Sequence, residues 1–136
     1  MRKNLVRANT PCPCESGLTY VECCGRWHGG LDEGCFAPSA ETLMRSRYSA
    51  YVLGLIDYLL ATWHGSTAPG ELELPPVKWL GLEVRHAQES GDAGVVEFVA
   101  RLRDDGRGGR IHEIGRFVRA NGRWYYIDGQ IMAEEN

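Results

Sequence analysis

Four cysteines within a 13-residue stretch constrain this chain more than any other feature. Cys12 and Cys14 are separated only by Pro13, and the adjacent pair Cys23 and Cys24 follows after eight residues. Four thiolates give the soft, tetrahedral ligand set that suits zinc, and four protein ligands leave no open position for catalysis. The spacing therefore predicts a structural zinc site with Cys12, Cys14, Cys23 and Cys24 as ligands.

The residues between the two cysteine pairs allow this convergence. Pro13 fixes φ in the first turn, and Gly17 permits the chain to reverse. Residues 18–22 are expected to form a helical turn that returns the second pair to the first, with Gly25 ending that turn.

Two alternatives to this ligand set stay open. The cysteines could form disulfides, but residues 1–10 lack the apolar core of a secretory signal, which predicts a cytoplasmic protein with reduced thiols. His28 could replace Cys24 as the fourth ligand, since imidazole also binds zinc. Cys35 stands apart from the cluster and is expected to be a small buried apolar residue.

Composition indicates one modest folded domain with a small appendage. The chain has 136 residues, of which 43% are hydrophobic and 24% charged. Its net charge of −3 argues against general nucleic-acid binding, which depends on neutralising phosphates. No apolar run is long enough to span a membrane. We expect a zinc knuckle at residues 1–30 and a main domain at residues 31–136, joined through the flexible, polar residues 29–34.

The main domain reads as helices followed by strands. Apolar residues at helical spacing from Met44 to Leu55 predict a helix capped by Ser39 and broken at Gly54, and a shorter helix follows over residues 55–63. Four alternating runs then predict an antiparallel sheet, over residues 80–85, 95–103, 111–119 and 124–131. A glycine-rich turn is expected over residues 104–110 and a two-residue hairpin turn at Asn121-Gly122. The fold class is therefore α+β.

Residues 12–24 resemble the SEC-C motif, a zinc-binding module found at the end of the SecA translocase, with the pattern C-x-C-x-S-G followed by C-C or C-H. Residues 43–51, 62–64 and 124–129 resemble blocks of the bacterial YchJ-like family. This resemblance implies a nuclear transport factor two-like main domain, a cone in which N-terminal helices pack on a curved antiparallel sheet. Family members carry SEC-C at one or both ends, and the resemblance supplies no established biochemical activity.

A cone of this kind has an apolar interior in which a few polar groups converge. The candidate pocket residues are the polar and aromatic side chains on the predicted helices and strands: Arg47, Tyr51, Trp63, His64, Arg116, Trp124 and Tyr126. Core packing is the simpler role for Trp63 and Trp124, and a helix-end hydrogen bond is the simpler role for His64.

Arg45 and Arg47 lie two residues apart on the predicted helix and point in different directions, so we expect at least one of them to be partly buried. A buried guanidinium needs a partner, and a structural ion pair is favoured over an anion clamp. Three carboxylates are candidate mates: Glu97, Glu113 and Asp128.

Two classes of function stay open. The leading hypothesis is a protein-interaction adaptor or scaffold, in which the knuckle contacts a protein partner and the main domain forms a monomer or a homodimer. The alternative is a small-ligand-binding protein or an enzyme of isomerase or hydratase type that uses the cone. Phosphate-binding loops, Ser-His-Asp order and metal-hydrolase helices are missing from the sequence, so no catalytic residue is assigned.

Overall fold

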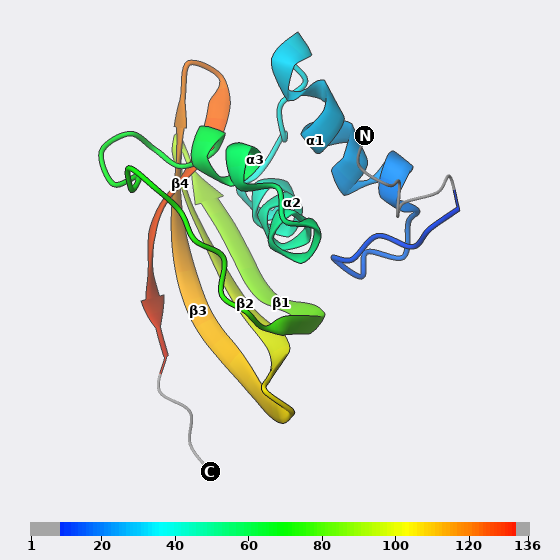
Figure 1. The fold of residues 1–136 in the computed structure, drawn as a ribbon. Coiled ribbons are helices and arrows are strands. Elements are labelled where there is room, and N and C mark those ends of the chain that lie inside the picture. The colour runs from blue at the N-terminus through cyan, green and yellow to red at the C-terminus, as the bar shows by residue number, and fades with distance from the viewer. Residues whose placement is uncertain (1–8, 133–136) are drawn as a thin grey trace.

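A four-stranded antiparallel meander forms one layer of the structure, and helices lie on its concave face (Figure 1). The computed structural model describes residues 9–132. The N-terminal part contains the short 3-10 helices η1 (Tyr20–Glu22) and η2 (Leu31–Glu33), with α1 (Cys24–Gly30) between them. The main helices are α2 (Ala40–Leu53) and α3 (Ile56–Ala61). The strands are β1 (Lys78–Ser90), β2 (Ala93–Asp104), β3 (Arg107–Ala120) and β4 (Arg123–Ile131). This is the α+β fold expected from the sequence.

Helix α2 begins and ends where its sequence predicts. The Ser39 hydroxyl accepts a hydrogen bond from the Thr42 backbone N–H at 3.0 Å, which satisfies a free donor of the first turn. At the other end Gly54 adopts a left-handed conformation with φ of 76°, which stops the helix and turns the chain into α3. Helix α2 is therefore fixed at both ends by local chemistry.

Short turns connect the strands of the sheet, and irregular pairing bends them. Strands pair in the order β1-β2-β3-β4, and the Asn121-Gly122 hairpin has positive φ at both residues, as a two-residue turn requires. The pairing register shifts twice between β1 and β2 and once between β3 and β4. Such bulges increase twist and bend the strands, which gives the sheet its concave face.

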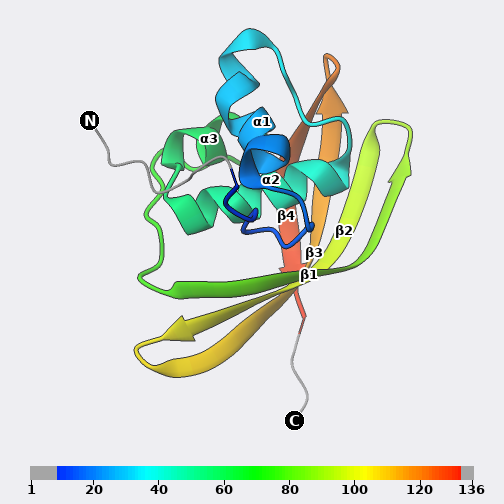
Figure 2. The ribbon, with the colours of Figure 1, turned by 90° about the vertical axis from the view of Figure 1, so that its right-hand side faces the viewer.

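The N-terminal segment packs on the side of α2 that faces away from the sheet (Figure 2), so α2 is the middle of three layers. One buried cluster runs through all three layers. It includes Cys12, Cys14 and Cys24 above α2 and Val96, Phe117 and Trp124 on or beside the sheet. The division into units at residues 1–30 and 31–136 stays a prediction, but the two parts share this apolar core.

Two glycine predictions were wrong, and close packing explains both. Gly25 was expected to end a turn but lies inside α1, where an added Cβ would meet the Tyr20 carbonyl oxygen at 2.7 Å. Residues 29–34 were expected to be a flexible joint but are largely helical, and a Cβ on Gly30 would meet the Cys35 Cβ at 2.5 Å. These glycines permit close approach of neighbouring chain segments, and their positions are not turns.

Two further expectations need correction. The turn between β2 and β3 is tighter than expected, because residues 107–110 already pair with β2 and only Asp105-Gly106 makes the reversal. Cys35 is exposed and does not lie in the core. In the described part of the chain, no helix is long and apolar enough to cross a membrane.

Candidate metal centre and cone cavity

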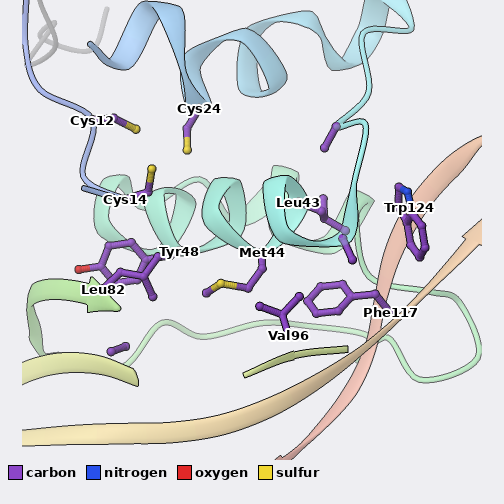
Figure 3. Close-up of a cluster of buried hydrophobic side chains, with 13 residues drawn as sticks. Cys12, Cys14, Cys24, Leu43, Met44, Tyr48, Leu82, Val96, Phe117 and Trp124 are labelled. Atoms are coloured by element: carbon purple, nitrogen blue, oxygen red, sulfur yellow. The ribbon is translucent and has the colours of Figure 1, made fainter. Parts of the chain in front are cut away.

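The four N-terminal cysteines, which we call the thiol cluster, converge on one point. Cys12 and Cys14 lie on a loop, and a hydrogen bond from the Cys12 N–H to the Leu18 carbonyl closes it at 3.0 Å. Cys23 precedes α1 and Cys24 is its first residue. All four sulfur atoms lie within 4.8 Å of one another, and Figure 3 shows those of Cys12, Cys14 and Cys24 pointing into the same space.

This geometry fits a tetrahedral ion. A Zn–S distance of about 2.3 Å places tetrahedral sulfur atoms about 3.8 Å apart, and Cys14 Sγ lies 3.6 Å from Cys23 Sγ. All five cysteines of the chain are free thiols. The donor set therefore fits a soft divalent metal such as zinc.

The electrostatics of the cluster also call for a cation. Hydrogen bonds with Cys14 and Cys24 lower the pKa of Cys12, whereas the contact with Cys12 raises the pKa of Cys24. Burial raises the pKa of Cys23. Four thiolates at this spacing would repel one another, and a cation among them would relieve that repulsion.

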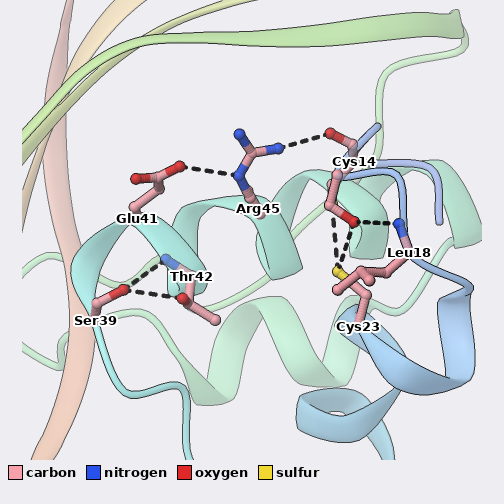
Figure 4. Close-up of polar contacts among 8 residues, drawn as sticks. Cys14, Leu18, Cys23, Ser39, Glu41, Thr42 and Arg45 are labelled. Atoms are coloured by element: carbon pink, nitrogen blue, oxygen red, sulfur yellow. Dashed lines mark hydrogen bonds and ion pairs between the residues drawn. The ribbon is translucent and has the colours of Figure 1, made fainter.

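Surrounding polar groups hold the cluster in place (Figure 4). Ser16 Oγ lies 3.2 Å from Cys23 Sγ and accepts a hydrogen bond from the Leu18 N–H at 3.2 Å. From α2, the Arg45 guanidinium donates to the Cys14 carbonyl at 2.9 Å and is also paired with Glu41. These contacts orient the ligand loop and tie it to the main domain.

His28, the alternative fourth ligand, has both ring nitrogens engaged elsewhere. Nδ1 lies 2.5 Å from the Tyr20 hydroxyl, and Nε2 lies 2.8 Å from the Ser46 carbonyl oxygen. Burial lowers its pKa, which favours the neutral ring. In this arrangement His28 joins η1, α1 and α2, while Cys24 supplies the fourth sulfur of the cluster.

A cavity of about 270 Å³, which we call the cone cavity, lies between α2 and the sheet. Most of its walls are apolar or aromatic. It is lined by Met44, Arg47, Tyr48, Tyr51, Trp63, Leu72, Glu73, Pro75, Trp79, Phe98, Ala100, Ile111, Glu113, Phe117 and Tyr126.

The structure brings together four of the seven residues that the sequence nominated for a pocket: Arg47, Tyr51, Trp63 and Tyr126. The other three do not line the cone cavity. His64 Nδ1 contacts the Ser66 hydroxyl at 2.8 Å. Arg116 is exposed and makes a two-pronged ion pair with Asp128. Trp124 is buried in the main core.

Arg47 is the buried arginine that the sequence anticipated, but its expected ion pair is absent among the described residues. Its side chain is 5% exposed, and Nη1 donates to the Leu59 carbonyl at 2.8 Å and to Thr62 Oγ1 at 2.7 Å. The guanidinium also lies over the rings of Trp63, at 5.0 Å, and Tyr126, at 4.7 Å. Backbone and ring faces therefore hold this cation where a carboxylate was expected.

The proposed carboxylate mates have other partners. Glu97 pairs with His112 at 2.8 Å, and Asp128 pairs with Arg116. Glu113 lines the cone cavity, where its Oε2 accepts a hydrogen bond from the Tyr126 hydroxyl at 2.9 Å. Burial raises the pKa of Glu113, which favours its neutral form.

Sequence reasoning did not nominate the lining residues Tyr48, Trp79, Phe98 and Glu113. Tyr48 follows Met44 and precedes Tyr51 at helical spacing, so the inward stripe of α2 contained it. Phe98 and Ala100 lie two residues apart in the second predicted strand, residues 95–103, so they share one face, and both line the cavity. These periodicities were the available signal. Glu113 was considered only as an ion-pair mate. A carboxylate on the inward face of a strand departs from the usual alternation of inward apolar and outward polar residues, so the pattern did not point to it.

Comparison with known proteins identifies the two parts of the chain. The family model "YchJ, middle NTF2-like domain" matches residues 39–129, and the SEC-C motif matches residues 9–26. A UPF0225 protein of Bordetella pertussis is 55% identical over 125 residues, which cover 88% of this chain and 92% of the relative. A UPF0225 protein of Methylibium petroleiphilum is 56% identical over 127 residues, covering 91% and 90%.

Two solved structures share the fold. The solution structure of a SEC-C motif containing protein from Rhodopseudomonas palustris matches with a TM-score of 0.78 and 36% identity, over 90% of this chain and 98% of that one. A crystal structure of a SEC-C motif containing protein from Psychrobacter arcticus matches with a TM-score of 0.77 and 29% identity, over 98% and 88%.

Proposed function

This chain belongs to the YchJ-like family, and on that premise we propose that it is a zinc-binding protein whose SEC-C knuckle acts as a protein-interaction adaptor. The convergence of four sulfur atoms within 4.8 Å carries the proposal. The ligands we assign are Cys12, Cys14, Cys23 and Cys24. Bound zinc would crosslink the ligand loop to the start of α1 and would take no part in catalysis.

Metal analysis of the purified protein tests the first part of this proposal. Protein produced with zinc available is expected to contain one zinc ion per chain. Replacement by Co²⁺ is expected to give the absorption bands of a tetrahedral tetrathiolate site. Protein that carries no metal under these conditions would contradict the proposal.

Two exposed apolar side chains on the knuckle support the adaptor role. Leu18 is 51% exposed and Val21 is 49% exposed, and both lie between the two cysteine pairs. A metal-crosslinked loop would hold them in fixed positions, and a rigid apolar contact loses little entropy on binding. We further propose that residues 1–30 act as the knuckle of a main domain spanning residues 31–136, in a cytoplasmic monomer or homodimer.

Partner capture tests the adaptor role. Leu18→Glu and Val21→Glu place charge on the exposed surface without touching a ligand, so metal content is expected to stay at one ion per chain. Quantitative pull-down from cell extract is expected to lose the same partners with either variant. Ile131→Glu is the matched control, because Ile131 is 63% exposed but lies on β4. Equal partner recovery by all three variants would argue against an adaptor surface on the knuckle.

The cone cavity favours a second candidate function, a small-ligand-binding protein or an enzyme of isomerase or hydratase type. The supporting observation is an apolar cavity of about 270 Å³ that contains a buried arginine, Arg47, and a half-buried glutamate, Glu113. A thermal-shift screen with small metabolites tests it, because a ligand that binds only the folded state raises Tm. Absence of any shift across acidic, neutral and basic compounds would count against it.

A further inference from the structure

We propose that the cone cavity binds a small organic monocarboxylate with a flat apolar or aromatic body, and that the ligand carboxylate pairs with Arg47. This inference rests on the second candidate function and names the chemical class of its ligand. It does not depend on the thiol cluster.

Arg47 is incompletely paired. The side chain is 5% exposed and lines the cavity, yet no carboxylate of the described residues lies within ion-pair distance. Nη1 is committed to the Leu59 carbonyl and Thr62 Oγ1, while Nε and Nη2 have no acceptor among the described residues. A buried guanidinium with free donors favours an anionic partner.

The free edge of Arg47 matches a carboxylate. Nε and Nη2 are the pair of donors that Arg116 uses on Asp128, at 2.6 and 2.7 Å. The same two-pronged contact is available for a ligand of Arg47, because its hydrogen bonds to Leu59 and Thr62 use Nη1 alone and the residue lines the cavity. A ligand carboxylate would complete this arrangement with two parallel hydrogen bonds.

The walls and volume of the cavity define the rest of the ligand. Aromatic rings from α2, β1, β2, β3 and β4 surround the space, which suits a flat apolar body: Tyr48, Tyr51, Trp79, Phe98, Phe117 and Tyr126. The volume of about 270 Å³ lies just below the range of about 300–1,000 Å³ for typical ligand pockets. That size suits a small molecule better than a dinucleotide or a large cofactor.

Glu113 is a half-buried charged group of the same cavity, and it raises the rival possibility of a cationic ligand. Burial raises the pKa of Glu113, which favours its neutral form, and its Oε2 already accepts a hydrogen bond from the Tyr126 hydroxyl. Arginine keeps its charge at neutral pH, so a cationic ligand would meet a repulsion that cannot be relieved by loss of a proton. Glu73 also lines the cavity but is exposed and solvated. The balance therefore favours a monoanion.

A titration of the metal-loaded full chain, followed by two-dimensional NMR, tests the ligand class. The probes are phenylacetate, phenylacetamide and 2-phenylethylamine, which share a ring and differ in charge. Phenylacetate is expected to shift cavity resonances and to bind at least about tenfold more tightly than the amide, with the amine weakest. Equal binding of acid and amide, tighter binding of the amine, or no binding of phenylacetate would overturn the proposal.

Variants of opposite expected sign sharpen the test. Arg47→Met is expected to weaken phenylacetate binding at least about thirtyfold, and Arg47→Lys is expected to retain part of it. Glu113→Gln is expected to tighten binding, because it removes a group whose ionised form would repel the ligand carboxylate. Arg103→Gln is the matched control for lost positive charge, since Arg103 is exposed and does not line the cavity. An equal loss in Arg103→Gln and Arg47→Met would show nonspecific attraction and overturn the assignment.

Ala100→Leu keeps the test decisive if Arg47→Met does not fold. Ala100 is 4% exposed and faces the cavity, so a leucine would occupy ligand space while all charges stay in place. Phenylacetate binding is expected to be lost in the folded variant, and unchanged binding would place the ligand elsewhere and overturn the proposal. In the thermal-shift screen, stabilisation by neutral or basic compounds alone would sink the carboxylate assignment but leave the second candidate function standing.

Discussion

The thiol cluster and the cone cavity lie on opposite sides of α2, and they bury charge in opposite ways. In the cluster, four sulfur atoms that repel one another when ionised surround a point suited to a cation. In the cavity, one guanidinium is held by two ring faces and two oxygen atoms, with donors left for an anion. An ion bound by the cluster, as proposed, would serve structure, whereas the cavity is formed by the packing of α2 on the sheet and a ligand bound there would serve function.

Removing one sulfur gives the largest effect that this comparison predicts. Cys24→Ser is expected to reduce zinc from one ion per chain to almost none and to lower the free energy of unfolding by at least about 4 kcal/mol. The loss is expected to extend beyond the knuckle, because Cys24 belongs to the same buried cluster as Val96 and Phe117. Metal analysis and thermal unfolding measure both quantities.

Cys35→Ser is the matched control for that prediction. Cys35 is exposed and lies outside the cluster, so its replacement is expected to change stability by no more than about 0.5 kcal/mol and to leave metal content unchanged. If Cys24→Ser kept a full complement of zinc, the contrast between a metal-dependent cluster and a preformed cavity would be broken.

The thiol cluster could be predicted from the sequence because its four ligands lie close together in the chain. Cys12 and Cys24 are 12 positions apart, and one proline and one glycine suffice to turn the loop back. The capping of α2 by Ser39 and the hairpin at Asn121-Gly122 were accessible for the same reason. Gly30 was misread, because its close contact with Cys35 depends on packing that residue type alone does not reveal.

The cavity could be predicted only in part from the sequence, because its walls come from segments that are far apart in the chain and are brought together by the fold. Trp63 and Trp124 were both candidate pocket residues because both are aromatic, but of the two only Trp63 lines the cavity. Distinguishing them needs the pairing of residue 63 with Tyr126 on β4, which is a tertiary contact. The prediction of an ion pair for Arg47 was wrong for a similar reason, because tertiary packing places its guanidinium over the rings of Trp63 and Tyr126.

A histidine substitution sharpens the boundary between ligand and scaffold. His28→Gln is expected to lower the free energy of unfolding by about 2–3 kcal/mol, because it disrupts buried contacts with the Tyr20 hydroxyl and the Ser46 carbonyl. Zinc content is expected to stay at one ion per chain. His64→Gln is the control, since its ring contacts Ser66 and Tyr125 and lies outside the thiol cluster. Loss of zinc in His28→Gln would transfer the fourth ligand position from Cys24 to His28.

The smallest predicted effect concerns Glu113, the half-buried carboxyl of the cavity. Burial raises the folded-state pKa of Glu113 above its ordinary value, so the folded protein holds this proton more tightly than the unfolded chain does. Its contribution to stability is therefore present below the unfolded pKa and is lost as pH rises through the folded pKa. Glu113→Gln keeps an acceptor for the Tyr126 hydroxyl and removes the titration. Thermal unfolding of Glu113→Gln between pH 4 and pH 8 is expected to show a Tm that depends less on pH, and a modestly higher Tm at pH 7, than that of the wild type.

Glu73→Gln is the control for this prediction. Glu73 lies at an exposed position of the same cavity, so its replacement is expected to leave the dependence of Tm on pH as in the wild type. If Glu113→Gln also followed the wild-type profile, the cavity would not hold a desolvated carboxyl, and its contrast with the thiol cluster would rest on Arg47 alone.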